Sequence, residues 1–211
     1  MLNNDKAFNR LMALLRSIDP KNPLPEELEP YLLLWMIDEP YCKKERSLEY
    51  QGEVPKNAYY VVHGLVKVYA WCPNGYRYLY RIYRENTIVA LKCFMDQEVS
   101  AFEIVACKNT LVRSISHAHM QKIYKHMEGM REMALKTAFM YSEAQEKLRT
   151  DLLALDVEAR LLKFYSLFKG LLPARTGPIR DEDVAGYLIL TKIQLKKVRM
   201  RLKKLGLIVS H

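Results

Sequence analysis

The stretch IRDEDVAGYLILTKIQLKKVRMRLKKLGLI, residues 179–208, decides the fold of the C-terminal part of the chain. The acidic run 181–183 falls in the first turn of a predicted helix, where it complements the positive end of the helix dipole. Thr191 is a good N-cap for a second helix, and Gly206 supplies its stop. The stretch therefore predicts two short helices joined by a short turn.

In both predicted helices, apolar residues recur every three or four positions, which places them on one face of each helix, toward a core. The inner positions are Val184, Ala185 and Leu188 in the first helix, and Leu195, Val198, Leu202 and Leu205 in the second. If Leu195 and Val198 face the core, the remaining side chains of the first two turns point to solvent. A helix-turn-helix places this end of its second helix in the major groove of DNA.

Positive charge is concentrated in the second predicted helix. The chain has a net charge of +9. Residues 192–204 contain the bases Lys192, Lys196, Lys197, Arg199, Arg201, Lys203 and Lys204 and no acid. A charge run is usually a solvated helix face, but this position in a helix-turn-helix favours double-stranded DNA as the partner. We predict base-edge positions at Lys192, Ile193, Gln194, Lys196 and Lys197 with the capping Thr191 beside them, and mainly phosphate contacts for Arg199, Arg201, Lys203 and Lys204.

The region before residue 117 has the pattern of short strands. YYVVHGLVKVYAW (59–71) is broken by Gly64, and an Asn-Gly pair at 74–75 predicts a hairpin turn into YRYLYRIY (76–83). Tyr76, Tyr78, Tyr80 and Ile82 should share one face of that second run, with Arg77 and Arg81 on the other. With a further strand-like run at 101–115, the pattern predicts a small antiparallel sandwich or barrel.

Helices are predicted on both sides of this β-region. Before it, residues 5–18 form one helix, and a second helical run continues through Leu34 to Ile37 and ends near Pro40. After it, residues 117–155 contain no proline, and Gly129 marks a break between a short and a long helix.

An apolar stripe on the long helix suits a dimer seam, and the alternative is packing on the chain's own β-region. The predicted dimer positions are Met133, Thr137, Met140, Tyr141, Ala144 and Leu148.

Composition restricts the class of protein. No run of about 18 apolar residues is present, and the N-terminus does not read as a signal peptide, so we expect a cytoplasmic protein that does not enter a membrane. The four cysteines are scattered without a Cys-x-x-Cys pair, which indicates ordinary thiols and no metal site. The sequence shows no nucleophile–base pair, phosphate loop or metal motif, so we expect no catalytic residues and no enzyme.

The whole pattern resembles the Crp/Fnr family of bacterial transcription regulators. In the C-terminal stretch, the resemblance rests on Val184-Ala185, Tyr187-Leu188, Thr191 and Leu205-Gly206-Leu207-Ile208, preceded by VEARLLKFYSLF (157–168). In the β-region it rests on Gly52-Glu53, Tyr60, Gly64 and Val66-Lys67-Val68-Tyr69.

The resemblance implies an α+β fold with an antiparallel, cyclic-nucleotide-binding-like β-roll, a long dimerisation helix and a winged-helix-like helix-turn-helix domain. It implies a sensor domain at residues 1–116, a helical connector at 117–155 and a DNA-binding domain at 156–211.

The chain departs from the family at its DNA-binding end. The family usually has Gly in the turn where this chain has Ile189, so the turn must avoid positive φ or accept strain. Ile193 replaces an acidic base reader, and it could touch a thymine methyl but not accept from cytosine. Little room remains for a wing after the second helix. The preferred DNA sequence should therefore differ from that of well-known members.

The family's cyclic AMP cassette is also altered. Alignment places Val89-Ala90 at the ribose-binding Gly-Glu pair and Val99-Ser100 at the phosphate-binding Arg-Ser pair. Valine cannot neutralise a phosphate, so cyclic AMP is disfavoured unless Arg84 or Lys92 takes over. Family branches also use haem, iron–sulfur clusters or organic ligands, and the roll could bind nothing; we expect no fixed cofactor and leave the effector open.

The sequence therefore favours a homodimeric regulator that binds a pseudo-palindromic operator, with RNA polymerase as a further candidate partner. Its rival is a ligand-binding signalling module whose vestigial helix-turn-helix acts through protein contacts.

Overall fold

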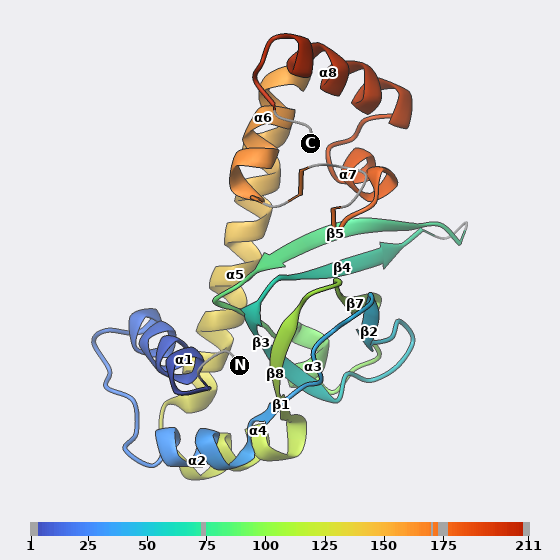
Figure 1. Cartoon of the computed structure of the whole chain (residues 1–211). Coiled ribbons are helices and arrows are strands. Elements are labelled where there is room, and N and C mark those ends of the chain that lie inside the picture. Colours follow the sequence, from blue (N-terminus) through green and yellow to red (C-terminus); the bar gives the residue numbers. More distant parts are fainter. Residues whose placement is uncertain (1–3, 73–74, 170, 173–176, 209–211) are drawn as a thin grey trace. The chain divides into compact units, whose positions relative to one another are not determined.

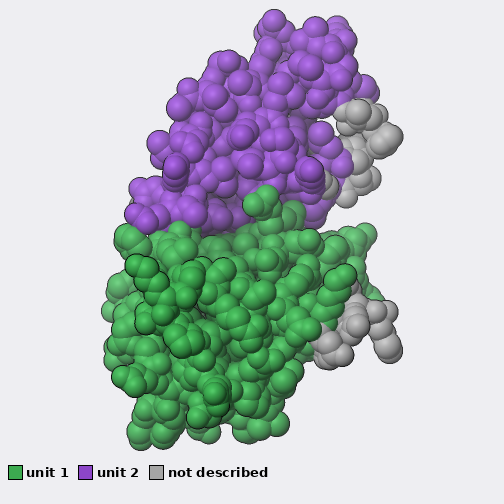
Figure 2. Space-filling view, turned by 90° about the vertical axis from the view of Figure 1, so that its left-hand side faces the viewer, with its two compact units in different colours: residues 1–66, 83–142 green, residues 67–82, 143–211 purple. Residues whose placement is uncertain are grey.

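The computed structural model describes residues 4–72, 75–169, 171–172 and 177–208 (Figure 1). It is a mixed α+β chain with antiparallel sheets before residue 117 and helices after it, as predicted. The chain divides into two compact units, coloured separately in Figure 2. Unit 1 comprises Met1–Val66 and Tyr83–Ser142, and unit 2 comprises Lys67–Ile82 and Glu143–His211.

Unit 1 contains an antiparallel sheet with the strand order β1-β8-β3-β6. Its strands are β1 (Ile37–Asp38), β8 (Leu111–Ser116), β3 (Asn57–His63) and β6 (Thr87–Val89). The central pair aligns Tyr59 with Ser114. A further antiparallel pair joins β2 (Arg46–Glu49) to β7 (Phe102–Ala106). The predicted run 101–115 is thus two strands, since residues 107–110 turn between β7 and β8.

Gly64 separates β3 from the next strand, as the sequence predicts. Its φ of +85° lies in the left-handed region. A Cβ added there would lie 2.6 Å from the Thr110 Oγ1. That hydroxyl accepts from the Leu65 N–H (3.1 Å) and donates to the Leu65 carbonyl (2.9 Å). Both the backbone conformation and the close approach therefore require glycine.

The helices of unit 1 are α1 (Asn4–Ile18), α2 (Leu28–Trp35), α3 (Lys92–Asp96), α4 (His117–His126) and the first half of α5 (Met130–Leu153). The helix predicted over 5–18 is confirmed, and so is the break at Gly129, whose φ is +74°. The prediction of a helical run from Leu34 to Ile37 is wrong at its end. Here α2 stops at Trp35, and Ile37 pairs with Ser114 in β1.

Unit 2 combines most of a strand pair with the C-terminal helices. Its elements are most of β4 (Leu65–Trp71) and β5 (Arg77–Arg84), residues 143–153 of α5, α6 (Val157–Leu167), α7 (Asp181–Tyr187) and α8 (Lys192–Lys204). The second predicted run forms β5, and its two faces differ less in burial than its alternation of tyrosine and arginine suggests. Ile82 on the predicted tyrosine face and Leu79 on the predicted arginine face are both buried.

One predicted connection, the hairpin turn at 74–75, falls partly outside the described residues. Within the described part of the chain, no helix has the length and apolar character needed to span a bilayer.

Candidate nucleic-acid interface and sensor cavity

The three C-terminal helices pack on a common apolar core. α6 begins at Asp156, whose carboxylate accepts from the Glu158 and Ala159 N–H groups at 2.9 Å. Its buried Phe164 lies 5.7 Å, ring centre to ring centre, from Tyr187 of α7. The buried positions of the core are Leu161, Phe164, Val184, Ala185, Tyr187, Leu188, Leu195 and Leu202. The inner faces predicted for the two helices are therefore confirmed at these positions, and Val198 is half-buried.

Both ends of α8 are capped by local hydrogen bonds. Thr191 and Gln194 form a capping box: the Gln194 N–H donates to the Thr191 Oγ1 at 3.1 Å, and the Thr191 N–H donates to the Gln194 Oε1 at 2.8 Å. At the other end Gly206 has a φ of +68°, and the Leu207 N–H reaches the Leu202 carbonyl at 2.9 Å. Two of the predicted DNA-binding residues, Thr191 and Gln194, thus fix where the helix begins.

The turn between α7 and α8 holds an isoleucine in a left-handed conformation. Ile189 has a φ of +54° and is 62% exposed. The Leu190 N–H donates to the Ala185 carbonyl (2.8 Å) and the Ile189 N–H to the Gly186 carbonyl (3.2 Å). This is a Schellman motif with isoleucine at the position that usually takes glycine. The sequence predicted that this turn either avoids a positive φ or accepts strain, and the positive φ of Ile189 shows that it accepts strain.

The first two turns of α8 present basic and apolar side chains to solvent. Ile193 is 80% exposed, and Lys196 and Lys197 are exposed beside it. Lys192 pairs with Glu182 of α7, and this contact lowers the pKa of the Glu182 carboxyl. No ion pair of Lys196 or Lys197 is found among the described residues. These two ammonium groups are therefore open to an anion.

The second half of α8 divides into exposed and engaged bases. Lys203 and Lys204 are exposed, and Arg201 pairs with Glu158 at 3.0 Å while staying mostly in solvent. Arg199 is different: its side chain is only 13% exposed, and its guanidinium contacts Asp181 and the Tyr165 hydroxyl. Arg199 thus packs the helix against its own unit and is not in the position expected of a phosphate contact.

Leu205 does not occupy the inner position that its spacing predicts. The helix ends at Lys204, and Leu205 forms the C-cap with 59% of its surface exposed. Its backbone is still helical, since its N–H donates to the Arg201 carbonyl at 3.1 Å, but its side chain lies beyond the end of the apolar core.

A buried acid joins α7 to β4 within unit 2. The Asp183 carboxylate accepts a hydrogen bond from the Tyr69 hydroxyl at 2.7 Å and lies 3.8 Å from the Nζ of Lys67, which is fully buried. Arg180 adds an ion pair at 3.3 Å, which raises the pKa of its guanidinium. The start of the helix-turn-helix is therefore tied to the strand pair by charge-assisted bonds.

Unit 1 contains an apolar cavity of about 100 Å³. It lies among β3, β8, the N-terminal helices and the first turns of α4 and α5, and five methionines contribute to its wall. These are Met36, Met95, Met120, Met130 and Met133. Ala90, one of the predicted pocket residues, also lines it.

The predicted dimer positions on α5 divide between buried and exposed. Met133 and Thr137 are buried inside unit 1, Met140 and Ala144 are exposed, and Tyr141 and Leu148 are half-buried. The exposed large apolar side chains of this helix are Leu135, Phe139 and Met140. Sequence reasoning missed Leu135 and Phe139, because it followed the stripe that packs on the β-region.

Residues 41–127 match the family described as cyclic nucleotide-binding domain. No curated protein matches the sequence significantly. Solved structures do match nearly the full length. A protein from Eubacterium rectale described as a transcriptional regulator of the Crp/Fnr family has a TM-score of 0.65 at 12% identity, over 89% of this chain and 88% of that one. The chain has the Crp/Fnr fold.

Two further structures share the Crp/Fnr fold with this chain. FixK2 from Bradyrhizobium japonicum has a TM-score of 0.60 at 19% identity, over 81% of this chain and 85% of that one. CLP from Xanthomonas campestris, described as a c-di-GMP responsive global regulator, has a TM-score of 0.61 at 14% identity, over 86% and 93%. At these identities the likeness concerns the fold.

The positions that align with the cyclic AMP cassette of Crp/Fnr regulators differ in burial and carry no charge. Val89 is fully buried in β6, and Val99 is exposed. Ser100 is buried, and its hydroxyl donates to the Phe102 carbonyl (2.9 Å) and accepts from the Phe102 N–H (3.0 Å). The serine hydroxyl is therefore used to close its own loop.

The two candidate replacement cations also lie in solvent. Arg84 is exposed at the end of β5. Lys92 is exposed and pairs with Asp96 one turn later on α3, and this contact raises the pKa of the Lys92 ammonium. Neither side chain is among the described residues that line the cavity of unit 1.

Proposed function

We propose that this protein is a dimeric, DNA-binding transcription regulator. The observation that supports it best is α8: a helix capped at both ends, seated on a three-helix core by Leu195 and Leu202, with Lys196 and Lys197 exposed on its opposite side. A rigid basic helix of this kind fits the major groove.

In this proposal the two halves of the helix have different roles. Lys196 and Lys197 read base edges, because they lie near the N-terminal end that enters the groove, and Ile193 contacts a thymine methyl. Arg201, Lys203 and Lys204 contact phosphates. Lys192 joins the base-reading group when DNA displaces its exposed partner Glu182.

The proposed dimer forms through the exposed apolar side chains of α5, namely Leu135, Phe139 and Met140. Two-fold symmetry would place two copies of α8 in successive major grooves roughly 34 Å apart, on a pseudo-palindromic operator. Residues 1–116 would serve as sensor, 117–155 as connector and 156–211 as DNA-binding domain, in the cytoplasm, with RNA polymerase as a further partner.

Salt dependence tests the DNA-binding claim. Binding to a selected operator and to random duplex DNA is measured by fluorescence anisotropy over a range of salt concentrations. Log affinity should fall steeply with log salt, and Lys203→Ala should reduce that slope by about 0.9 per subunit, or about 1.8 for a dimer that loses two phosphate contacts. Lys197→Ala should weaken operator binding more than random-DNA binding, while Lys163→Ala on α6, also exposed, should change neither. Equal losses on both DNAs would remove Lys197 from the base-reading group.

We further propose that the protein does not respond to cyclic AMP through the usual cassette. Support comes from the buried Val89, the exposed Val99 and the engaged hydroxyl of Ser100. Calorimetric titration with cyclic AMP should give no saturable heat, and a saturable one would contradict the proposal.

A second candidate is a signalling module whose helix-turn-helix no longer binds DNA. The strained turn at Ile189 favours it, because a DNA-binding domain under selection would be expected to keep glycine there. A flat salt response on every DNA tested would support this candidate over the regulator.

A further inference from the structure

The cavity in unit 1 has an almost entirely apolar wall. Its lining comes from strands β3, β6 and β8 and helices α1 to α5, and no charged side chain is among the described lining residues. A cyclic phosphate placed there would lose its hydration without gaining a cation, which costs far more than the apolar contacts return.

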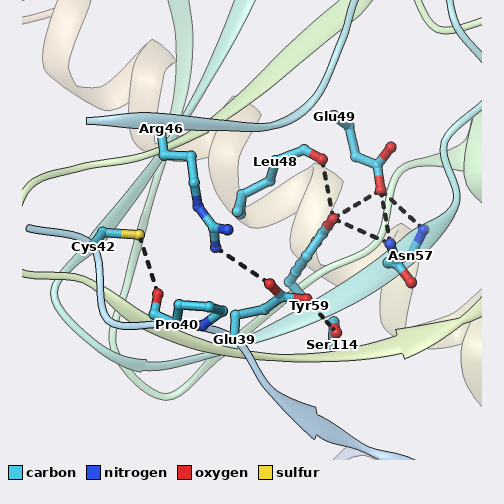
Figure 3. Close-up of polar contacts among 9 residues, drawn as sticks. All are labelled: Glu39, Pro40, Cys42, Arg46, Leu48, Glu49, Asn57, Tyr59 and Ser114. Atoms are coloured by element: carbon cyan, nitrogen blue, oxygen red, sulfur yellow. Dashed lines mark hydrogen bonds and ion pairs between the residues drawn. The ribbon is translucent and has the colours of Figure 1, made fainter. Parts of the chain in front are cut away.

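The side-chain oxygens around the cavity are mostly engaged elsewhere. The Tyr59 hydroxyl donates to the buried carboxylate of Glu49 at 2.8 Å (Figure 3). The Tyr60 hydroxyl donates to Asn86 at 2.7 Å. The Thr137 hydroxyl donates one turn back to the Met133 carbonyl at 2.6 Å. Tyr124 supplies the remaining hydroxyl among the described lining residues, so a ligand with several polar groups would leave most of them unpaired.

The size and the side chains of the cavity fit an uncharged guest. An apolar cavity of about 150 Å³ in a protein core binds benzene or xenon and stays free of water. The five methionines of the wall are unbranched and polarisable, so they can adjust to the shape of such a guest. Contact of their sulfur atoms with an aromatic ring would add to its affinity.

We propose that this cavity is a binding site for a small, uncharged, apolar molecule, of the size and character of a simple aromatic hydrocarbon. The idea that a guest here acts as an effector rests on the function proposed above, because α5 is the proposed dimer helix and supplies part of the wall together with α4. The idea that the cavity binds a guest is independent of that function and can be tested without DNA.

Methyl NMR of methionine gives the direct test, with benzene as the probe. The full chain is labelled at the methionine methyl groups and titrated with benzene. The methyl signals of Met120, Met130 and Met133 should shift in a saturable way, whereas Met200 on the exposed side of α8 should not. Shifts that rise linearly at every methionine, Met200 included, would overturn the proposal.

Filling the cavity gives the second test. Ala134→Leu and Ala90→Leu each add an isopropyl group to the wall, and each should weaken benzene binding at least about tenfold by occupying its space. Ala154→Leu adds the same group at an exposed position and should leave the affinity unchanged. Two independent filling positions guard against a variant that does not fold, and a melting curve of each shows whether it does.

The outcomes separate the two proposals. Saturable benzene binding that both filling variants abolish supports the cavity site, even if no DNA binds and the regulator proposal fails. Unchanged benzene affinity in a folded Ala134→Leu variant contradicts the cavity site, even if the salt titration shows that the protein binds DNA. Saturable shifts of the same methyl groups by cyclic AMP, with none by benzene, would also overturn it.

Discussion

At Ile189 we expect a glycine variant to be more stable than an alanine variant, which reverses the usual order at a helical position. At an ordinary exposed helical position, alanine is more stabilising than glycine by about 0.5–1 kcal/mol, because glycine has more freedom in the unfolded chain. At residue 189 the φ of +54° adds a cost of about 1–2 kcal/mol for any residue with a Cβ. Comparing Ile189→Gly with Ile189→Ala isolates this cost, since both variants remove the same buried part of the isoleucine.

The difference should favour glycine by about 0.5–1 kcal/mol. Gly186, three residues earlier in the same turn region, is the matched control: its φ is not positive, and a Cβ there would have nothing within 4 Å. Gly186→Ala should therefore raise the free energy of unfolding by about 0.5–1 kcal/mol. Two neighbouring positions should thus prefer opposite residues.

Urea unfolding followed by Trp71 fluorescence reports on unit 2, in a Trp35→Phe background that removes the signal from α2 of unit 1. Each kcal/mol corresponds to a shift of about 2–4 °C in Tm for a chain of this length, so calorimetry provides a second readout. If Ile189→Ala proves as stable as Ile189→Gly or more so, the turn does not hold a positive φ, and the strain argument fails.

Three further perturbations have defined outcomes. Asp183→Asn removes the carboxylate that faces the buried Lys67 ammonium and should lower the free energy of unfolding by about 2–3 kcal/mol. Glu182→Gln breaks an exposed ion pair and should cause a much smaller loss, so equal losses in urea unfolding would contradict the burial argument. The Tyr187 hydroxyl is buried without a hydrogen-bond partner among the described residues, and burial raises its pKa to about 12. Tyr187→Phe should therefore leave the free energy of unfolding in urea unchanged or raise it by about 1 kcal/mol. A clear loss of stability would mean that the hydroxyl has a partner. Burial lowers the pKa of His117, so the imidazole binds a proton more readily in the unfolded chain than in the folded one. The free energy of unfolding should therefore fall as the pH drops through about 6.5. Unfolding curves of His117→Gln across this range should show a weaker fall.

Local signals made the helix-turn-helix predictable from the sequence. The cap at Thr191 and the stop at Gly206 act within a few residues of themselves, so the sequence contains all the information they need. The spacing of Thr191 and Gln194 is likewise the local sequence signature of a capping box.

Residues whose environment depends on distant segments were not predictable. Arg199 looks like one more base in a basic run until α6 supplies Tyr165 and α7 supplies Asp181. Lys67 alternates with apolar residues in β4 and would be expected to point to solvent, yet Asp183 lies more than a hundred residues later and is brought beside it. Pairings of this kind come from tertiary packing, which spacing does not reveal.

The shortest elements escaped prediction for a different reason. Strands β2 and β6 have four and three residues, too few to establish an alternating pattern. The cavity could not be predicted for a similar reason. Each element contributes only one to a few apolar residues to its wall, and in the sequence these look like ordinary core residues.

The bonds between Asp183 and β4 set a condition for building hybrid regulators. A graft that moves only residues 156–211 into another regulator would carry Asp183 along but leave its partners Tyr69 and Lys67 behind. The recipient would then need to offer its own hydroxyl and ammonium at that place, or leave the transplanted carboxylate without its bonds. Residues 67–82 should therefore travel with the C-terminal helices, although they lie far from them in the gene.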